Sequence, residues 1–227
     1  MTDRSLVAVS VLSLLGTLGL YGYCVLVPPE LLTSPGPADK VGRYVAVEGL
    51  VREVYSARNG DIHAELLPQG RPPGVWLVVP GEASWAPELC RLLLTGARVR
   101  AEGVVGEYNG EFQLSIRGAG DVRLLGNSSL ELVWGRPDLL NNTSVCFAGL
   151  AFYKDLYKNR LTFRLLDRYS PSLELNCSSS SYKITDERPR WENGTLVKVS
   201  GRLKYTGTPP SPRLYLAGGA AGVEPLG

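Results

Sequence analysis

The stretch GARVRAEGVVGEYNGEFQLSI, residues 96–116, decides the fold. Apolar and other residues alternate between Val99 and Val104, and they do so again between Phe112 and Ile116. Asn109-Gly110, a pair that favours the tight turn of a β-hairpin, separates the two halves. Alternation with a period of two is typical of strands that bury one face. Residues 96–116 therefore predict two antiparallel strands joined by a hairpin.

The residues before this stretch predict three more strands and one helix. Strands are expected over 45–54, 62–66 and 75–79, where Val, Ile and Leu recur with strand spacing. Residues 82–94, EASWAPELCRLLL, have apolar residues at helical spacing and end at Thr95-Gly96. The 26 Gly and 16 Pro of the 227-residue chain favour many turns over long helices. The predicted order is three strands, one helix and two strands.

The second half of the chain repeats this order. SVCFAGLAFYKD (144–155), NRLTFRLLD (159–167) and SLELNCS (172–178) predict the first three strands, and a polar helix or loop is expected at 185–192. TLVKVSGRLKYTG (195–207) and the RLYLAGG segment then predict the last two strands. LLTGARVRAEGVVGEYNG and WENGTLVKVSGRLKYTG match most clearly, since each places a Gly before the strand and an aromatic residue before the closing turn. An internal duplication is therefore predicted.

This order, with a long bent first strand relieved by Gly49 or Gly149, resembles the OB-fold, a five-stranded Greek-key barrel. Residues 96–116 look like the fourth and fifth strands of the tRNA-anticodon-binding-like OB superfamily. The resemblance implies a mostly β protein with two OB-like five-stranded Greek-key barrels, and the N-terminal residues place these barrels after one transmembrane helix. A pair of β-sandwiches is the alternative.

The N-terminus predicts a membrane anchor. Residues 5–27 contain no charged side chain. A helix of this length can span a bilayer, with Tyr21 and Tyr23 near its outer end. A cleaved signal peptide is the alternative. The predicted parts are the anchor at 1–28, a Pro-rich stalk at 29–40, OB-like domain 1 at 41–126, a linker at 127–142 and OB-like domain 2 at 143–227.

Five N-x-S/T sequons place the domains outside the cytoplasm. All follow residue 126, with candidate glycosylation sites at Asn127, Asn141, Asn142, Asn176 and Asn193. We expect a single-pass membrane protein with extracytoplasmic C-terminal domains and protein partners at the cell surface. Sequons together with few lysines suggest an archaeal cell surface.

Cysteine and histidine indicate neither a metal site nor catalysis. Cys146 and Cys177 are the only pair within one predicted domain, so they form a disulfide or are two buried thiols. His63 is the only histidine and falls on the polar side of its strand. We expect no enzymatic activity, no metal and no cofactor. OB-fold haem chaperones share the anchor and barrel, but their haem-attaching His belongs to a C-terminal segment, and this chain has none there.

The charge distribution points to the second domain for ligand binding. Residues 38–126 hold 10 Lys or Arg and 11 Asp or Glu, a net of −1, whereas residues 130–227 hold 13 and 9, a net of +4. OB-fold proteins bind single-stranded nucleic acid, oligosaccharides or proteins on strands two and three. The resemblance and the basic residues make single-stranded nucleic acid or another polyanion the expected ligand. Candidate ligand-binding residues are Tyr153, Lys154, Tyr157, Lys158, Arg160, Arg164, Lys204 and Tyr205.

Two alternatives remain at this point. Arg160 and Arg164 alternate with Leu161, Phe163 and Leu165, so they also fit the solvated face of a half-buried strand. A structural or protein-interaction scaffold in a cell-surface assembly is the alternative function, and a haem-chaperone role is a remote one.

Overall fold

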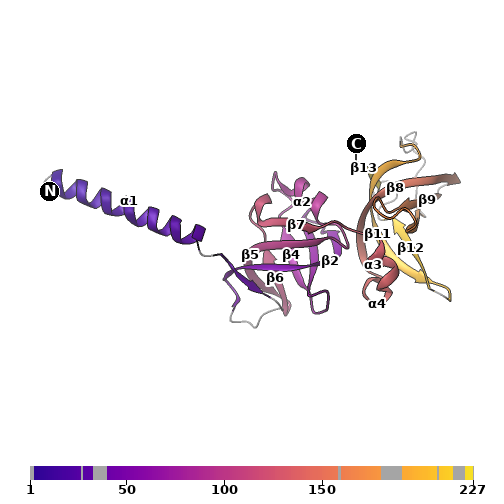
Figure 1. Ribbon diagram of the computed structural model, residues 1–227, viewed down its shortest axis with the longest axis horizontal. Helices are drawn as coiled ribbons and strands as arrows, with labels where there is room; N and C mark the ends of the chain where they lie inside the picture. The colour runs from indigo at the N-terminus through magenta and orange to yellow at the C-terminus, as the bar shows by residue number, and fades with distance from the viewer. Residues whose placement is uncertain are drawn as a thin grey trace. The chain divides into compact units, whose positions relative to one another are not determined.

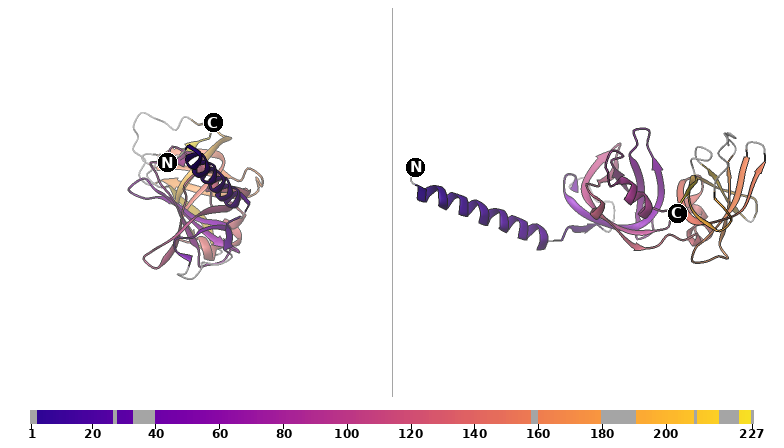
Figure 2. Two further views of the ribbon diagram at one scale, coloured as in Figure 1. Left: turned by 90° about the vertical axis from the view of Figure 1, so that its left-hand side faces the viewer. Right: turned by 90° about the horizontal axis from the view of Figure 1, so that it is seen from above.

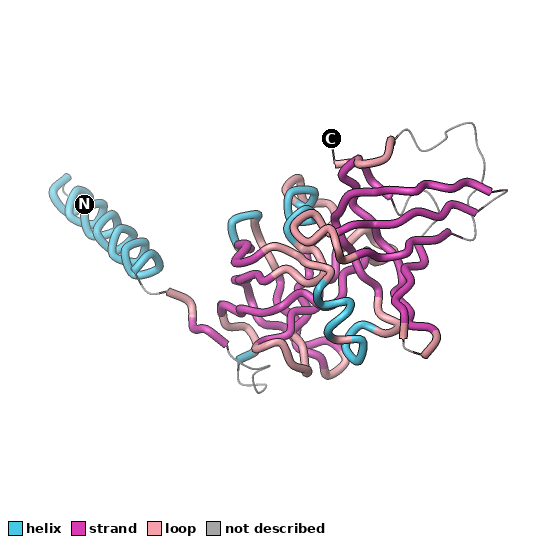
Figure 3. Tube along the Cα trace, turned by 45° about the vertical axis from the view of Figure 1, so that its right-hand side comes forward, coloured by secondary structure: helices cyan, strands magenta, loops and turns pink. Residues whose placement is uncertain are grey.

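The computed structural model describes residues 3–26, 28–32, 40–157, 160–179, 191–208, 210–216 and 223–226. The chain divides into two compact units, Met1–Glu30 and Leu31–Gly227. Most of the second unit is β-sheet (Figure 1, Figure 3). The prediction of a mostly β protein is confirmed.

The first unit contains helix α1 (Asp3–Leu26), and strand β1 (Glu30–Leu32) follows it. The helix predicted over residues 5–27 is therefore present. Among the described residues, however, no helix combines the length and apolar character that crossing a membrane requires. The transmembrane assignment of residues 5–27 is not supported. Most of the predicted stalk, residues 33–39, lies outside the described residues.

Barrel 1 is built from five strands and closes on itself. Its strands are β2 (Tyr44–Ser56), β3 (Ile62–Pro68), β4 (Val75–Val79), β5 (Arg98–Tyr108) and β6 (Glu111–Ser115). They pair in the order β2-β3-β4-β6-β5, and β5 also pairs with β2. The β4–β6 pair is parallel and the other four are antiparallel. This is the connection of an OB-like Greek-key barrel.

Barrel 2 repeats this topology. Its strands are β8 (Ser144–Tyr157), β9 (Arg160–Leu166), β10 (Glu174–Ser179), β11 (Thr195–Thr206) and β12 (Ser211–Leu216). They pair in the order β12-β10-β9-β8-β11, β11 also pairs with β12, and β10–β12 is the parallel pair. Two OB-like barrels are therefore present, and the view from above shows the strands of each curving around its own interior (Figure 2, right).

Each barrel also has a short strand added to its fourth strand. Strand β7 (Val122–Gly126), which follows the short 3-10 helix η2 (Ala119–Asp121), pairs with β5, and β13 (Val223–Pro225) pairs with β11. Helix α2 (Ala86–Leu92) lies between β4 and β5, as the apolar spacing of 82–94 predicted. The polar helix or loop expected at 185–192 falls almost entirely outside the described residues.

Glycines at matching positions support the duplication. A Cβ on Gly49 would lie 2.9 Å from the Leu67 carbonyl oxygen, and one on Gly149 would lie 2.5 Å from that of Leu166. Gly201 would likewise meet the Tyr215 carbonyl oxygen at 2.3 Å. The first and fourth strands bend against a neighbouring backbone at these points, where only a residue without a side chain fits.

The predicted linker is a folded part of barrel 2. It contains α3 (Glu131–Gly135) and α4 (Pro137–Leu140), which were not predicted. The linker's buried apolar side chains join the core of barrel 2, and they are Leu130, Val133, Leu139 and Leu140. Asp167, in turn, accepts a hydrogen bond from the Leu130 backbone N–H at 2.7 Å through Oδ2.

The two barrels contact each other through buried polar and apolar groups. The Thr95 N–H donates to the Cys146 carbonyl oxygen at 2.8 Å, and the Cys146 N–H donates to Thr95 Oγ1 at 3.1 Å. Leu67 of barrel 1 packs in the core cluster of barrel 2. Residues 31–227 accordingly form one compact unit with two cores.

Candidate nucleic-acid interface

Four strands of barrel 2 present one row of polar side chains on the outer face. In register across β9, β10, β12 and β11, the row consists of Arg164, Asn176, Arg213 and Lys204. All four are exposed. Because adjacent strands are about 4.8 Å apart, the row extends over roughly 14 Å. We call it the cationic row.

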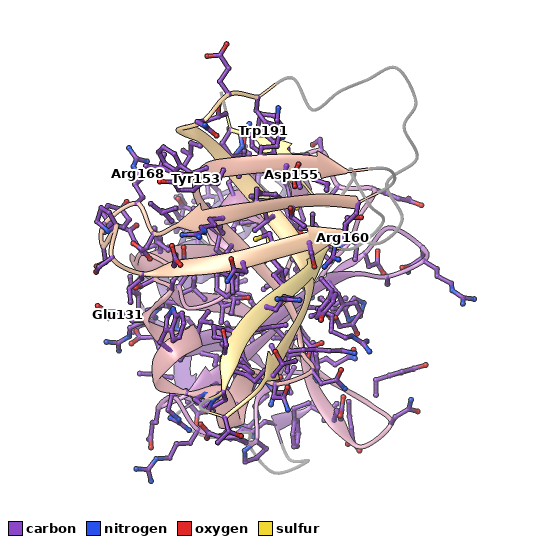
Figure 4. All side chains as sticks on the ribbon, turned by 90° about the vertical axis from the view of Figure 1, so that its right-hand side faces the viewer. Glu131, Tyr153, Asp155, Arg160, Arg168 and Trp191 are labelled. Carbon is purple, nitrogen blue, oxygen red and sulfur yellow. The ribbon has the colours of Figure 1, made fainter. Side chains whose placement is uncertain are left out.

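A second row lies next to the cationic row on the same face. It consists of Thr162, Ser178, Tyr215 and Arg202, again paired across β9, β10, β12 and β11. The Lys204 ammonium lies 5.7 Å from the centre of the Tyr215 ring, so the two rows are in contact there. Arg160, at the start of β9, adds a further exposed cation (Figure 4).

Acidic side chains neutralise part of this face. Arg164 Nη1 lies 3.2 Å from Glu174 Oε2, with about half of each side chain exposed. Asp155 is paired in register with Thr162. Within the described part of the chain, by contrast, Arg160, Arg202, Arg213 and Lys204 form no ion pair. The cations on this face therefore outnumber its carboxylates.

Tyr153 stands beside the cationic row because the first strand of barrel 2 is irregular. The register of β8 against β9 shifts between Phe152 and Asp155, and Tyr153 has a φ of 54°. Its side chain is 69% exposed, and the Arg164 guanidinium carbon lies 5.1 Å from the ring centre. Tyr153, Arg160, Arg164, Asn176 and Arg213 line a shallow hollow of ≈ 340 Å³. An exposed ring beside cations can stack on a base while the cations neutralise phosphates.

The structure brings together some of the predicted ligand-binding residues. Tyr153, Arg160, Arg164 and Lys204 share the face just described. Lys154 contacts Trp191 instead. Its Nζ donates to the Trp191 carbonyl oxygen at 3.1 Å and lies 5.0 Å from the centre of the Trp191 ring. Lys158 lies outside the described residues, as does the side chain of Tyr157.

Tyr205, also predicted to bind ligand, makes its side-chain contact away from the cationic row. Its hydroxyl donates to the Val133 carbonyl oxygen, which ties the side chain to α3 instead of to the cationic row. Burial, with the Asp138 carboxylate as a smaller cause, raises the pKa of Tyr205 to about 12. Its role is to hold the folded linker against β11.

Arg213, Tyr215 and Asn176 also belong to this face, although none of them was predicted as a candidate ligand-binding residue. The alternation of Pro212, Leu214 and Leu216, all buried, indicates that the residues between them point outward. That signal was available for β12. Asn176 was predicted as a glycosylation site, and its place between Arg164 and Arg213 follows from the strand register.

The corresponding face of barrel 1 has different chemistry. Matching the strand registers of the two barrels equates the cationic row with Glu65, Trp76, Gln113 and Gly106. Glu65 is buried and pairs with Arg52. Burial raises the pKa of Glu65, and the Arg52 guanidinium opposes that effect. Barrel 1 therefore has no counterpart of the cationic row.

His63 takes part in an aromatic cluster. Its ring stacks on Tyr55, with centroids 5.1 Å apart and planes 9° apart, and Trp76 meets Tyr55 edge-on at 5.7 Å. No group of three His, Cys, Asp or Glu side chains that could hold a metal occurs among the described residues. The packing makes His63 a neighbour of an aromatic side chain on the outer face of β3.

Cys146 and Cys177 do not form the disulfide that the sequence left possible. Both are free and buried, as is typical of structural thiols. Ser200 Oγ donates to Cys146 Sγ at 3.4 Å, and Cys177 Sγ donates to the Leu175 carbonyl oxygen at 3.6 Å. Burial raises the pKa of both thiols. The alternative of two buried thiols is the one observed.

No protein-family model matches the chain, and no curated protein sequence matches it. Solved structures that are similar include the p204 HINb domain (14% identity, 79% of this chain and 96% of that chain, TM-score 0.32). The Ifi202 HINa domain in complex with 20-bp dsDNA is 10% identical over 76% of this chain and 91% of that chain, with a TM-score of 0.34. The asparaginyl-tRNA synthetase of Entamoeba histolytica is 18% identical over 47% of this chain and 25% of that chain, with a TM-score of 0.37. At these scores, the assignment of OB-like barrels rests on strand order and register.

Proposed function

We propose that the protein binds single-stranded nucleic acid on the outer face of barrel 2. The observation that supports this best is the in-register series Arg164, Asn176, Arg213 and Lys204, which extends across the second, third, fifth and fourth strands of the barrel. Strands two and three are those on which OB-fold proteins hold their ligands.

The aromatic side chains favour nucleic acid over other polyanions. Tyr153 is 69% exposed and Tyr215 is 37% exposed, and each has a cation near its ring. Stacking of a base on an aromatic ring contributes about 1–3 kcal/mol per base. Acidic polysaccharides lack aromatic bases, so rings gain less from contact with them. A ligand with both phosphates and bases makes use of every exposed group on this face.

The first experiment measures binding of the full chain to labelled single-stranded DNA, RNA and an acidic polysaccharide at low and physiological salt. We expect the single strands to bind and their affinity to fall with salt, because each phosphate that a cation neutralises contributes a slope of about −0.7 to log K against log salt. Arg160→Glu should weaken binding, since it reverses an exposed charge that has no ion-pair partner among the described residues.

Two results would contradict the proposal. Preferential binding of the polysaccharide would identify a different polyanion. Absence of salt-dependent binding to all three would favour the alternative role as a protein-interaction scaffold.

An extracytoplasmic location is a further proposal, supported by the sequons. All five acceptor asparagines are exposed, so a glycan at each would project into solvent. Loss of mass on treatment of the cell-derived protein with a glycosidase is the expected result, and an unchanged mass would remove the support that the sequons give.

A further inference from the structure

A second recess lies where the two barrels meet. It has a volume of ≈ 500 Å³, within the range of about 300–1,000 Å³ that is usual for ligand sites. Barrel 1 contributes Tyr55 and Cys90 to its lining, and barrel 2 contributes Cys146, Lys198, Arg202 and Tyr215. We call this recess the inter-barrel cavity.

The inter-barrel cavity is continuous with the outer face of barrel 2. Arg202 and Tyr215 line the cavity and also belong to the second row of that face. Two residues away along β11 and β12 lie Lys204 and Arg213 of the cationic row. A chain bound along the cationic row therefore reaches the mouth of the cavity without leaving the protein surface.

The charges around the cavity favour an anion. Lys198 and Arg202 line it, and none of the described residues in its lining carries a carboxylate. Lys198 Nζ lies 3.9 Å from Glu224 Oε2, so its charge is partly balanced from outside the lining. Arg202 has no ion pair among the described residues. The lining side chains that carry charge are therefore cationic, while two carboxylates lie next to the lining: Glu224 beside Lys198, and Glu53, which accepts a hydrogen bond from the Ser144 N–H at 3.1 Å.

Aromatic rings from both barrels line the same cavity. Tyr55 is 39% exposed and Tyr215 is 37% exposed. The His63 ring stacks on one face of Tyr55 with centroids 5.1 Å apart, and the Trp76 ring packs edge-on against it at 5.7 Å, so a base would stack on the face of Tyr55 that His63 does not cover. Rings of this kind stack on bases that have been splayed out of a helix or that were never paired.

We infer that a single strand bound to barrel 2 continues into the inter-barrel cavity, where a base stacks on Tyr55 or Tyr215 and the adjacent phosphates lie against Arg202 and Lys198. The inference rests on the proposed function and adds a second binding site for the same strand. A duplex keeps its bases stacked inside and cannot offer one to the cavity without the cost of unpairing it, which is a few kcal/mol.

Anisotropy measurements on the full chain test this inference. The probes are a labelled strand of about 6 nucleotides, short enough for one barrel, one of about 15 nucleotides, and a duplex of the longer sequence. Tyr55→Ala should weaken the longer strand by roughly fivefold or more, the effect of losing one stacked base, and leave the short strand unchanged. Tyr55→Phe, which keeps the ring, should bind like the wild type. Lys198→Gln should also weaken only the longer strand.

Tyr108→Ala is the matched control, because Tyr108 is a tyrosine of barrel 1 that is 64% exposed and lies outside the cavity lining. If the wild type binds both strands and Tyr55→Ala binds the longer one equally well, the inference is wrong and the proposed function stands. Equal affinity of the wild type for duplex and single strand would also overturn the inference. Failure of the wild type to bind any strand would instead refute the proposed function.

Discussion

Replacing Arg213 with Ala should weaken single-strand binding by an amount that depends on salt. Arg213 is exposed, lies in register between Asn176 and Lys204, and makes no ion pair among the described residues. Its removal should therefore cost little folding stability and should release one phosphate contact. One contact contributes about 0.7 to the slope of log K against log salt. Extrapolated to a standard of 1 M salt, that slope corresponds to about fivefold in affinity at 0.1 M and about twelvefold at 0.03 M.

The assay is a titration of the labelled strand of about 15 nucleotides across a salt series for wild type and variant. Arg117→Ala is the matched control, because Arg117 is an exposed arginine of barrel 1 and its loss changes the net charge equally. The reasoning fails if Arg117→Ala weakens binding as much as Arg213→Ala, since net charge would then explain the effect. It also fails if Arg213→Ala and the wild type show the same slope of log K against log salt.

Three further predictions concern the barrel and its modification. Asp167→Ala should lower the free energy of unfolding by about 3 kcal/mol. The reason is that the Asp167 carboxylate accepts hydrogen bonds from the N–H groups of Leu130, Tyr169 and Ser170 at 2.7, 2.8 and 2.9 Å. Urea denaturation measures this effect, and an unchanged midpoint would contradict the docking of the linker on barrel 2. The free energy of unfolding should fall between about pH 10 and about pH 12, because the folded-state pKa of Tyr205 is raised to about 12 and the fold stabilises the neutral hydroxyl. Tyr205→Phe should flatten that part of the stability profile. An identical profile for the variant and the wild type would contradict this role of Tyr205. A glycan attached at Asn176 should abolish strand binding, because Asn176 lies in the middle of the cationic row. The Asn176→Gln variant cannot carry this glycan and serves as the comparison. If the glycosylated protein and the variant bind the strand equally well, the proposed location of the interface is wrong.

The barrels could be predicted because their strands obey a local rule. In β9 the buried residues Leu161, Phe163 and Leu165 alternate with more exposed ones, and the same holds for Leu214 and Leu216 in β12. A period of two can be recognised from neighbouring residues alone, without knowing which strands pair with each other. The hairpin at Asn109-Gly110 is equally local, and both of these residues have the positive φ that the turn requires.

The linker could not be predicted in the same way. Residues 127–142 include polar and turn-forming residues, and the two helices have five and four residues. Helices this short are stabilised by tertiary packing and not by their own propensity. Here, the packing is that of Leu139 and Leu140 against the barrel core, which depends on contacts with strands far away in the sequence.

The interface depends on pairings that the sequence does not display. Arg164 and Lys204 are 40 positions apart in the chain, and they share a row because β10 and β12 lie between β9 and β11. A shift of one residue in any of these pairings would turn a side chain to the opposite face. The sequence shows which residue types lie on each strand. Predicting which of these residues form one row also requires the register of the strand pairs.

The duplication makes barrel 1 an internal comparison for the interface on barrel 2. At the positions equivalent to the cationic row, barrel 1 places a buried Glu65 paired with Arg52, and Trp76 packs there in the aromatic cluster. Its own side chains thus fill the face that barrel 2 leaves open. Solvation of a half-buried strand explains why polar residues lie outside the core, and on barrel 2 these residues include four exposed cations that form no ion pair in the described structure. In the proposed function, a polyanion pairs with these cations, and the inter-barrel cavity gives that polyanion a path toward the aromatic residues of barrel 1.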